Sequence, residues 1–223
     1  MEPRRRIAAL SGHVAAAPRT AAASRCGASS APAGEGRRPP SGPYSPGVVA
    51  GGFLYIASSA GSDADGVVPD SFEERVANCC ETMRSVCEAA GLTLEHLCLL
   101  QISLGEIGQY ERALEVLATY WPSNPPTRAT LGNAMGEGFI GLSGIAIVDL
   151  SQKRAVSLPD GVPNNNGAFA PGIVAGDRLF VGGQLGRDPV RQLVPENPDE
   201  QVAIALCATR PPPAHAPPPP TIC

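Results

Sequence analysis

The stretch GPYSPGVVAGGFLYI (42–56) returns 125 residues later as GAFAPGIVAGDRLFV (167–181). Within the stretch, two short apolar runs flank the pair Gly51-Gly52, a pattern that predicts two antiparallel strands joined by a tight turn. Seven residues recur at this one offset, as Gly42/Gly167, Pro46/Pro171, Gly47/Gly172, Val49/Val174, Ala50/Ala175, Gly51/Gly176 and Leu54/Leu179. Repetition at a fixed long offset predicts two copies of one structural unit.

The residues that follow the first hairpin complete an α+β unit. Ser71 and Glu74 are placed to cap the start of an amphipathic helix that ends at Gly91. A second helix is indicated by the apolar spacing of Tyr110, Leu114, Leu117 and Trp121. Further strands are expected at 98–104, 128–134 and 139–148, with one more short strand before the first helix left open. This order predicts an α+β sandwich in which one antiparallel-rich sheet carries two helices on one face.

Composition divides the 223 residues into five segments. Residues 1–40 hold seven arginines and two glutamates without apolar periodicity, as in a transit peptide, a disordered tail or a wrongly chosen start codon. The α+β unit covers 41–150, a linker follows at 151–163, and a truncated second copy covers 164–209. A proline-rich tail, 210–223, is expected to be disordered. The truncation has two open explanations, a partial tandem repeat or an exon or reading-frame error.

Charge and hydropathy argue against two function classes. The net charge is −4, so removing the +5 of residues 1–40 leaves −9 on the rest. An acidic body is a poor match for nonspecific nucleic-acid binding. No run reaches the roughly 18 apolar residues of a membrane span, so no membrane partner is expected. The location expected is an organelle, mitochondrion or chloroplast, if 1–40 is a transit peptide, and the cytoplasm otherwise.

The cysteines do not indicate a metal site. Seven cysteines without a CxxC pair fit neither a disulfide framework nor a zinc site. Cys79, Cys80 and Cys87 fall within the first predicted helix, and the spacing of its apolar side makes Cys79 a core residue rather than a ligand. No metal and no cofactor are therefore expected.

Taken together, these segments resemble the RidA (YjgF, endoribonuclease L-PSP) family. The resemblance rests on GPYSPGVVAGGFLYI, on EAAGLTLEHL after the capped helix, on the strand CLLQISL and above all on NPPTRATLGNAM (124–135). It covers 42–148 fully and 164–209 in part. It implies a chorismate-mutase-like fold, a homotrimer with sites in clefts between subunits, and hydrolysis of reactive imines or enamines formed from amino acids.

The resemblance also implies the site residues. Arg128 matches the family's substrate-binding arginine, and a guanidinium suits the substrate carboxylate because it makes two parallel hydrogen bonds. Thr130 stands where many active members have a cysteine, and Tyr44 matches an aromatic residue on the facing edge of the cleft. Ser58 and Ser59 lie where the family usually reads SGQ, and this chain reads SSA.

Two departures weaken the case for catalysis. Active members place a glutamate that positions the attacking water in the last strand, and this chain has Gly141 and Ser143 at the aligned positions. In the second copy Phe169 replaces Tyr44, and nothing corresponds to Arg128.

Three functions are therefore expected in order. The first is a 2-iminobutanoate/2-iminopropanoate deaminase that yields 2-keto acids and ammonia, with a small 2-imino or 2-keto carboxylate as its ligand. The second is a catalytically silent module that binds or senses small carboxylates. The third is a ribonuclease or translation inhibitor, which the acidic body disfavours.

Overall fold

The computed structural model describes residues 29–31, 43–158, 169–188 and 193–207. The larger of its two sheets has six strands in the order β1-β2-β3-β6-β4-β5. Its strands are β1 (Ser29–Ala31), β2 (Gly47–Ala50), β3 (Phe53–Ser59), β4 (Leu97–Leu104), β5 (Thr127–Gly132) and β6 (Ile140–Ile147). Only β4 and β5 pair in parallel, so the antiparallel-rich sheet predicted from the sequence is confirmed.

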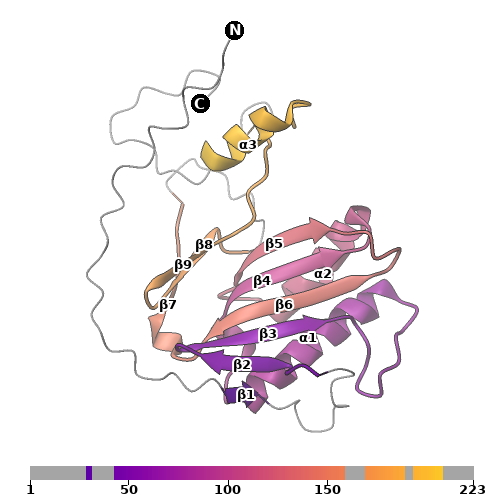
Figure 1. The fold of residues 1–223 in the computed structure, drawn as a ribbon, viewed down its shortest axis with the longest axis vertical. Coiled ribbons are helices and arrows are strands. Elements are labelled where there is room, and N and C mark those ends of the chain that lie inside the picture. Colours follow the sequence, from indigo (N-terminus) through magenta and orange to yellow (C-terminus); the bar gives the residue numbers. More distant parts are fainter. Residues whose placement is uncertain (1–28, 32–42, 159–168, 189–192, 208–223) are drawn as a thin grey trace.

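Two helices, α1 (Phe72–Ala89) and α2 (Tyr110–Tyr120), cover one face of this sheet, as predicted (Figure 1). Successive residues of a strand point to opposite faces, so Leu54 packs under the helices while its neighbour Phe53 points to the other side. The thiols of Cys79, Cys80 and Cys87 are buried in the helix-side core, and the prediction of a packing role for Cys79 is confirmed.

Helix α1 begins as its sequence indicates. The Ser71 hydroxyl accepts a hydrogen bond from the backbone N–H of Glu74 at 3.3 Å, which satisfies one of the free amides of the first turn. The return bond expected from the Glu74 side chain is replaced by a different contact, in which the Ser71 hydroxyl donates to Glu73 at 3.2 Å. The helix ends at Ala89, and Gly91 follows at φ 74°, a conformation that favours glycine.

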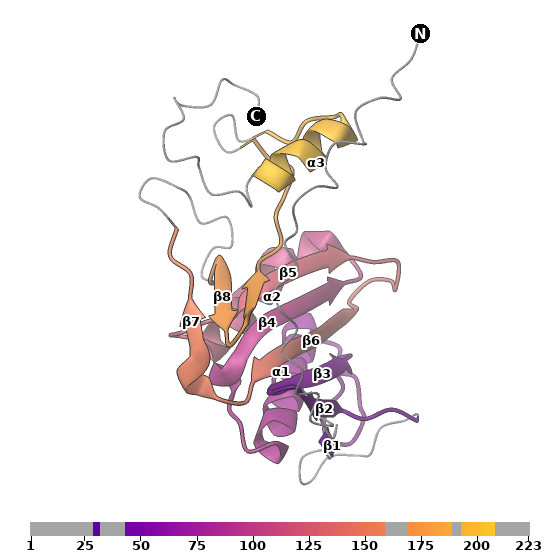
Figure 2. The same ribbon diagram turned by 60° about the vertical axis from the view of Figure 1, so that its left-hand side comes forward.

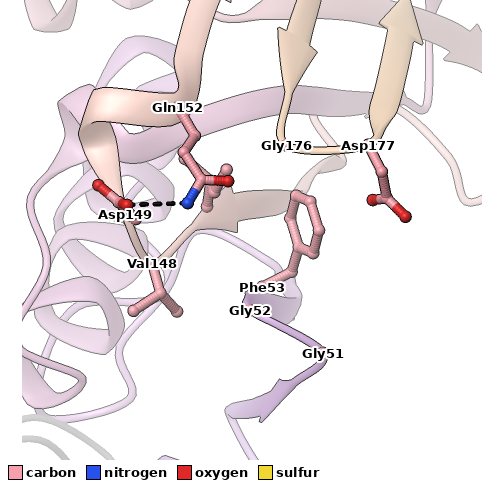
Figure 3. Close-up of a pocket in the computed structure, with 9 residues that line it drawn as sticks. Gly51, Gly52, Phe53, Val148, Asp149, Gln152, Gly176 and Asp177 are labelled. Atoms are coloured by element: carbon pink, nitrogen blue, oxygen red, sulfur yellow. Dashed lines mark hydrogen bonds between the residues drawn. The ribbon is translucent and has the colours of Figure 1, made fainter. Parts of the chain in front are cut away.

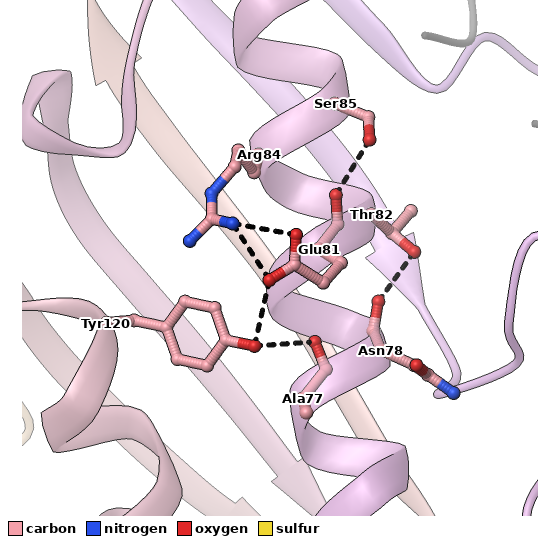
Figure 4. Close-up of polar contacts among 7 residues, drawn as sticks. All are labelled: Ala77, Asn78, Glu81, Thr82, Arg84, Ser85 and Tyr120. Atoms are coloured by element: carbon pink, nitrogen blue, oxygen red, sulfur yellow. Dashed lines mark hydrogen bonds and ion pairs between the residues drawn. The ribbon is translucent and has the colours of Figure 1, made fainter. Parts of the chain in front are cut away.

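A polar cluster joins the two helices on their outer side (Figure 4). The Tyr120 hydroxyl at the end of α2 donates to Glu81 on α1 at 3.0 Å, and Arg84 pairs with the same carboxylate at 2.8 Å. Burial, followed by the bond to Glu81, raises the pKa of Tyr120 to about 12. The phenol therefore stays protonated at neutral pH and can serve as a donor in this clamp.

A second sheet packs on the face opposite the helices. It has the order β7-β8-β9, with β7 (Lys153–Ala155), β8 (Gly172–Ala175) and β9 (Arg178–Val181). The second hairpin, β8–β9, has the register of the first, since Ala50 pairs with Phe53 and Ala175 with Arg178. Ile173 and Ala175 are fully buried with Phe53, Cys98 and Ile147 of the large sheet. The second hairpin is thus held by the first unit (Figure 2).

The last described helix, α3 (Pro198–Cys207), begins where the notional second copy would begin its own α1, but it does not cover the second hairpin. Leu179 and Val181 of β9 stay 59% and 46% exposed, as does Val202 of α3 at 57%. In the first unit the corresponding Leu54 is fully buried. Among the described residues, no helix covers these side chains of the second hairpin as α1 covers Leu54.

Three details differ from the sequence predictions. Ser29–Ala31, inside the segment expected to be disordered, pairs with the outer edge of β2. Lys153–Ala155, inside the expected linker 151–163, pairs with β8. Residues 60–71 form turns in place of the optional strand. Both added strands are three residues long, too short to show periodicity. The rest of 1–40 and the tail 210–223 lie outside the described residues.

Candidate functional site

Arg128 lies on β5, the edge strand of the large sheet, and its side chain points to the helix face. In the parallel register Arg128 pairs with Leu100 and Thr130 with Ile102, and both partners belong to the helix-side core. The Arg128 side chain accordingly meets Tyr110 at the start of α2. The arginine is 7% exposed, an unusual burial for this residue type.

The guanidinium of Arg128 lies between two aromatic rings. Its Cζ is 4.9 Å from the ring centre of Tyr110 and 5.5 Å from that of Phe169, distances at which a cation is attracted to a ring face. Nη2 donates to the Tyr110 hydroxyl, and Nη1 donates to the Thr130 hydroxyl at 3.3 Å. The rings and hydroxyls orient the guanidinium but supply no negative charge.

The described residues form no ion pair with this buried cation, and the Glu111 carboxylate acts on it only at longer range. Their ion pairs join Arg84 to Glu81, Arg112 to Glu73 and Arg178 to Asp177, and none reaches Arg128. Nε of Arg128 is buried without a hydrogen-bond partner. Burial lowers the pKa of Arg128 from its ordinary value. A buried charge that lacks a partner is costly, so the arrangement favours an anion that would supply one.

Segments on both sides of the second hairpin cross β5 at Arg128. On one side, the Ala170 N–H donates to the Pro126 carbonyl at 3.1 Å, and the Thr127 hydroxyl donates to the Pro171 carbonyl at 3.3 Å. On the other side, the Gly183 N–H donates to the Arg128 carbonyl at 2.7 Å. We call residues 169–171 and 182–183 the strap. The strap satisfies part of the free edge of β5 and brings Phe169 onto the guanidinium.

Thr130 is the one other predicted site residue that joins Arg128, through the hydrogen bond named above. Tyr44 does not, because it precedes β2 and three strands separate β2 from β5. Four inter-strand spacings put the two strands about 19 Å apart. Tyr44 is 54% exposed, whereas Phe169, its counterpart in the repeated stretch, is 3% exposed at Arg128. The sequence signal that could have identified Phe169 as a site residue is the offset of 125 residues from Tyr44.

Ser58 and Ser59 lie on β3, also away from Arg128 in the same chain. The Ser59 hydroxyl donates to the Cys79 carbonyl at 3.5 Å, a bond that ties β3 to α1. Gly141 and Ser143 point to the face opposite Arg128, since their neighbours Ile140 and Leu142 belong to the helix-side core. A Cβ on Gly141 would approach the Ser58 hydroxyl to 3.0 Å, so a larger residue there would press on β3.

A separate pocket of about 430 Å³ opens between the turns of the two hairpins (Figure 3). Its lining includes Gly51, Gly52, Phe53, Gly176 and Asp177. A further lining carboxylate, on Asp149, accepts hydrogen bonds from Ser151 and Gln152, so it caps a helical turn. The pocket marks the contact between the hairpins and has no convergent set of polar groups.

The described ranges contain neither a metal-binding cluster nor a membrane-spanning helix. No three His, Cys, Asp or Glu side chains gather there as metal ligands. Among these same residues, no helix has the length and apolar character needed to span a membrane.

Comparison with known proteins relates the chain to one group. A family model described as endoribonuclease L-PSP matches residues 35–135. A RutC family protein of Saccharolobus solfataricus is 34% identical over 94 residues, which cover 41% of this chain and 75% of the relative. A RutC family protein of Aquifex aeolicus is 30% identical over 96 residues, 42% of this chain and 77% of the relative.

Solved structures show the same fold. A protein of the conserved Rid family from Yersinia pestis is 21% identical with a TM-score of 0.51, and the match covers 54% of this chain and 99% of that one. A probable translation initiation inhibitor from Rhodopseudomonas palustris is 25% identical with a TM-score of 0.50, and the match covers 54% and 97%. The shared fold is the α+β unit that carries Arg128.

Proposed function

The chain belongs to the RutC (RidA/YjgF, endoribonuclease L-PSP) family, and from that premise we propose that it binds small 2-imino carboxylates at Arg128 and hydrolyses them. In this reaction water adds to the C=N carbon, and the resulting carbinolamine releases ammonia to leave the 2-keto acid. Enamines such as 2-aminoacrylate would enter after tautomerisation to the imine.

The observation that carries the proposal is the buried guanidinium of Arg128 without an ion-pair partner among the described residues. A carboxylate bound side-on would accept from Nε, which has no partner, and from Nη2. The two hydrogen bonds fix the substrate plane. The imine carbon, one bond away, would then lie beside the hydroxyls of Tyr110 and Thr130, which flank the guanidinium.

Those hydroxyls are the groups available to hydrogen-bond the imine nitrogen. Burial raises the pKa of Tyr110, so its phenol is protonated at neutral pH and has a proton to donate. A hydrogen bond to the nitrogen makes the carbon more electrophilic and favours the attack of water. The chain offers no carboxylate for that water at 141 or 143, so we expect modest rate acceleration.

The test follows imine hydrolysis by the full chain. 2-Iminopropanoate is generated in place by an amino-acid oxidase acting on alanine, and its disappearance is compared with the uncatalysed rate. We expect acceleration that Arg128→Ala abolishes. The test uses a protein concentration at which binding of pyruvate to the chain can be saturated. If the imine still decays at the uncatalysed rate, the chain is not a deaminase.

A second candidate function is carboxylate binding without catalysis. The observation that favours it is the residue pair Gly141 and Ser143, which cannot activate water as a carboxylate can. This candidate predicts that calorimetry with pyruvate gives a saturable signal while imine hydrolysis is unchanged. The acidic charge of the chain still weighs against the ribonuclease alternative.

The assembly and the cellular location are further proposals. Because Tyr44 precedes β2, three strands away from β5, it could face Arg128 only in another copy of the chain, as in a homotrimer. Light scattering of the full chain tests this proposal. Residues 1–28, the greater part of the proposed organelle-targeting segment, lie outside the described residues, and imaging of a tagged full chain tests their role.

A further inference from the structure

We propose that the strap is a displaceable cover that closes the Arg128 site from within the chain, an inference that rests on the proposed function for its ligand. Tyr110 and Thr130, which also contact the guanidinium, belong to the α+β unit itself. Phe169 comes from outside that unit and lies 5.5 Å from the guanidinium. With Arg128 7% exposed, this closed arrangement leaves a carboxylate no access.

The repeated sequence shows that Phe169 is buried by this contact and not by the needs of its own hairpin. Tyr44 holds the same position relative to the first hairpin, whose register is the same, and it is 54% exposed. Phe169 at 3% exposure therefore gains its burial from docking on the first unit, where it packs on Arg128 and the helix-side core. Phenylalanine also lacks the hydroxyl of its counterpart, so it covers the cation without supplying a hydrogen bond that a ligand would have to replace.

The strap can open while the hairpin remains in place. Ile173 and Ala175 anchor β8 in an apolar cluster with Phe53, Cys98 and Ile147. Ala170 of the strap also joins this cluster, whereas Phe169 packs in the helix-side core. The N-terminal part of the strap is held beside β5 by hydrogen bonds from Ala170 and to Pro171 and by the burial of the Phe169 and Ala170 side chains. A carboxylate that pairs with the buried guanidinium gives a charge-assisted gain, which competes with these contacts of the strap.

The C-terminal part of the strap depends on close approach. A Cβ on Gly183 would lie 3.3 Å from the Cα of Ala129, so a branched side chain there would push the segment off β5. Gly183→Val is therefore a second way to open the cover that leaves the Phe169 ring intact. Leu179→Ala, at an exposed position of the same hairpin outside the strap, is the matched control.

The first measurement is labelling of Arg128 with phenylglyoxal in the full chain, followed by peptide mass spectrometry. The reagent reports access to the guanidinium whatever the natural ligand is. We expect Phe169→Ala and Gly183→Val to label Arg128 about tenfold faster than the wild type, and Leu179→Ala to label at the wild-type rate. Unchanged labelling in both strap variants overturns the proposal.

The second measurement is calorimetry with 2-oxobutanoate. Molecules in which the strap is closed do not bind the ligand, so they lower the apparent affinity for 2-oxobutanoate. Variants that open the strap should therefore bind it up to about tenfold more tightly. If Phe169→Ala labels faster but binds 2-oxobutanoate more weakly, Phe169 is part of the binding site. That result would overturn the proposal that it covers the site. If the strap variants label faster but no variant binds 2-oxobutanoate, the cover is supported and the proposed function is refuted. The two proposals can therefore be distinguished by these measurements.

Discussion

At the scale of single residues, the proposed function depends on how one arginine is placed. Strand alternation directs Arg128 toward α2, where a leucine or valine would normally complete the core. The guanidinium tolerates this place because two aromatic rings lie within cation–π distance of it and its N–H groups remain for hydrogen bonds. Lysine would pack poorly there and would offer a point charge.

We predict that Arg128→Ala weakens 2-oxobutanoate binding by roughly 30- to 150-fold, equivalent to about 2 to 3 kcal/mol for a lost charge-assisted pair. Arg128→Lys should retain part of the affinity. Arg178→Ala is the control, because Arg178 also stacks on an aromatic ring, 4.5 Å from Phe53, but lies outside the site. Calorimetry that gives equal affinities for wild type and Arg128→Ala would remove Arg128 from the site.

At the scale of elements, α1 joins the sheet to α2 and carries two testable features. The first is its cap. Because Ser71 accepts from the Glu74 amide, Ser71→Ala should lower the free energy of unfolding by about 1 kcal/mol. Ser71→Asp, which restores an acceptor at the positive end of the helix, should recover most of the loss. Urea unfolding of the three proteins measures both effects, and equal midpoints for wild type and Ser71→Ala would contradict the capping role.

The second feature is the row of buried thiols. Burial raises the pKa of Cys79 to about 11 and that of Cys87 to about 12, from an ordinary value of 9. Below pH 9 both thiols are protonated in the folded and unfolded states. Above it the unfolded state ionises first, so the free energy of unfolding falls as the pH rises through 11.

We therefore predict that stability declines between pH 9 and 11, by on the order of 2 kcal/mol for each thiol. Cys79→Ala removes one of the groups, and its urea midpoint should fall less steeply over this range than that of the wild type. Identical slopes would show that Cys79 does not contribute.

Elements with a long periodic pattern could be predicted, and contacts between distant segments could not. The cap at Ser71 and the run 97–104 fix α1 and β4 through local chemistry. The three-residue strands β1 and β7 carry no pattern and form because the edges of β2 and β8 need partners. Arg128 and Thr130 were found as neighbours on one strand, whereas Phe169 reaches them only through tertiary packing.

At the scale of the whole molecule, the second hairpin depends on the first unit in two ways. Its inner face shares the cluster of Phe53, Cys98 and Ile147, and its strap satisfies part of the edge of β5. Edge strands that lack such cover tend to pair with other chains. The second hairpin therefore protects the sheet that supports it, and its own exposed Leu179 and Val181 show that it has no core of its own.

We predict that residues 160–223 do not fold alone. The fragment supplies a hairpin and α3 but neither β7 nor the large sheet, so Ile173 and Ala175, fully buried in the whole chain, would face water. A fragment of this size seldom stabilises a single core without disulfides or metal. Circular dichroism of the isolated fragment should show no cooperative thermal transition, whereas the full chain should show one. A cooperative transition from a monomeric fragment would mean that the hairpin and α3 form a core of their own, and the strap would then belong to an independent domain.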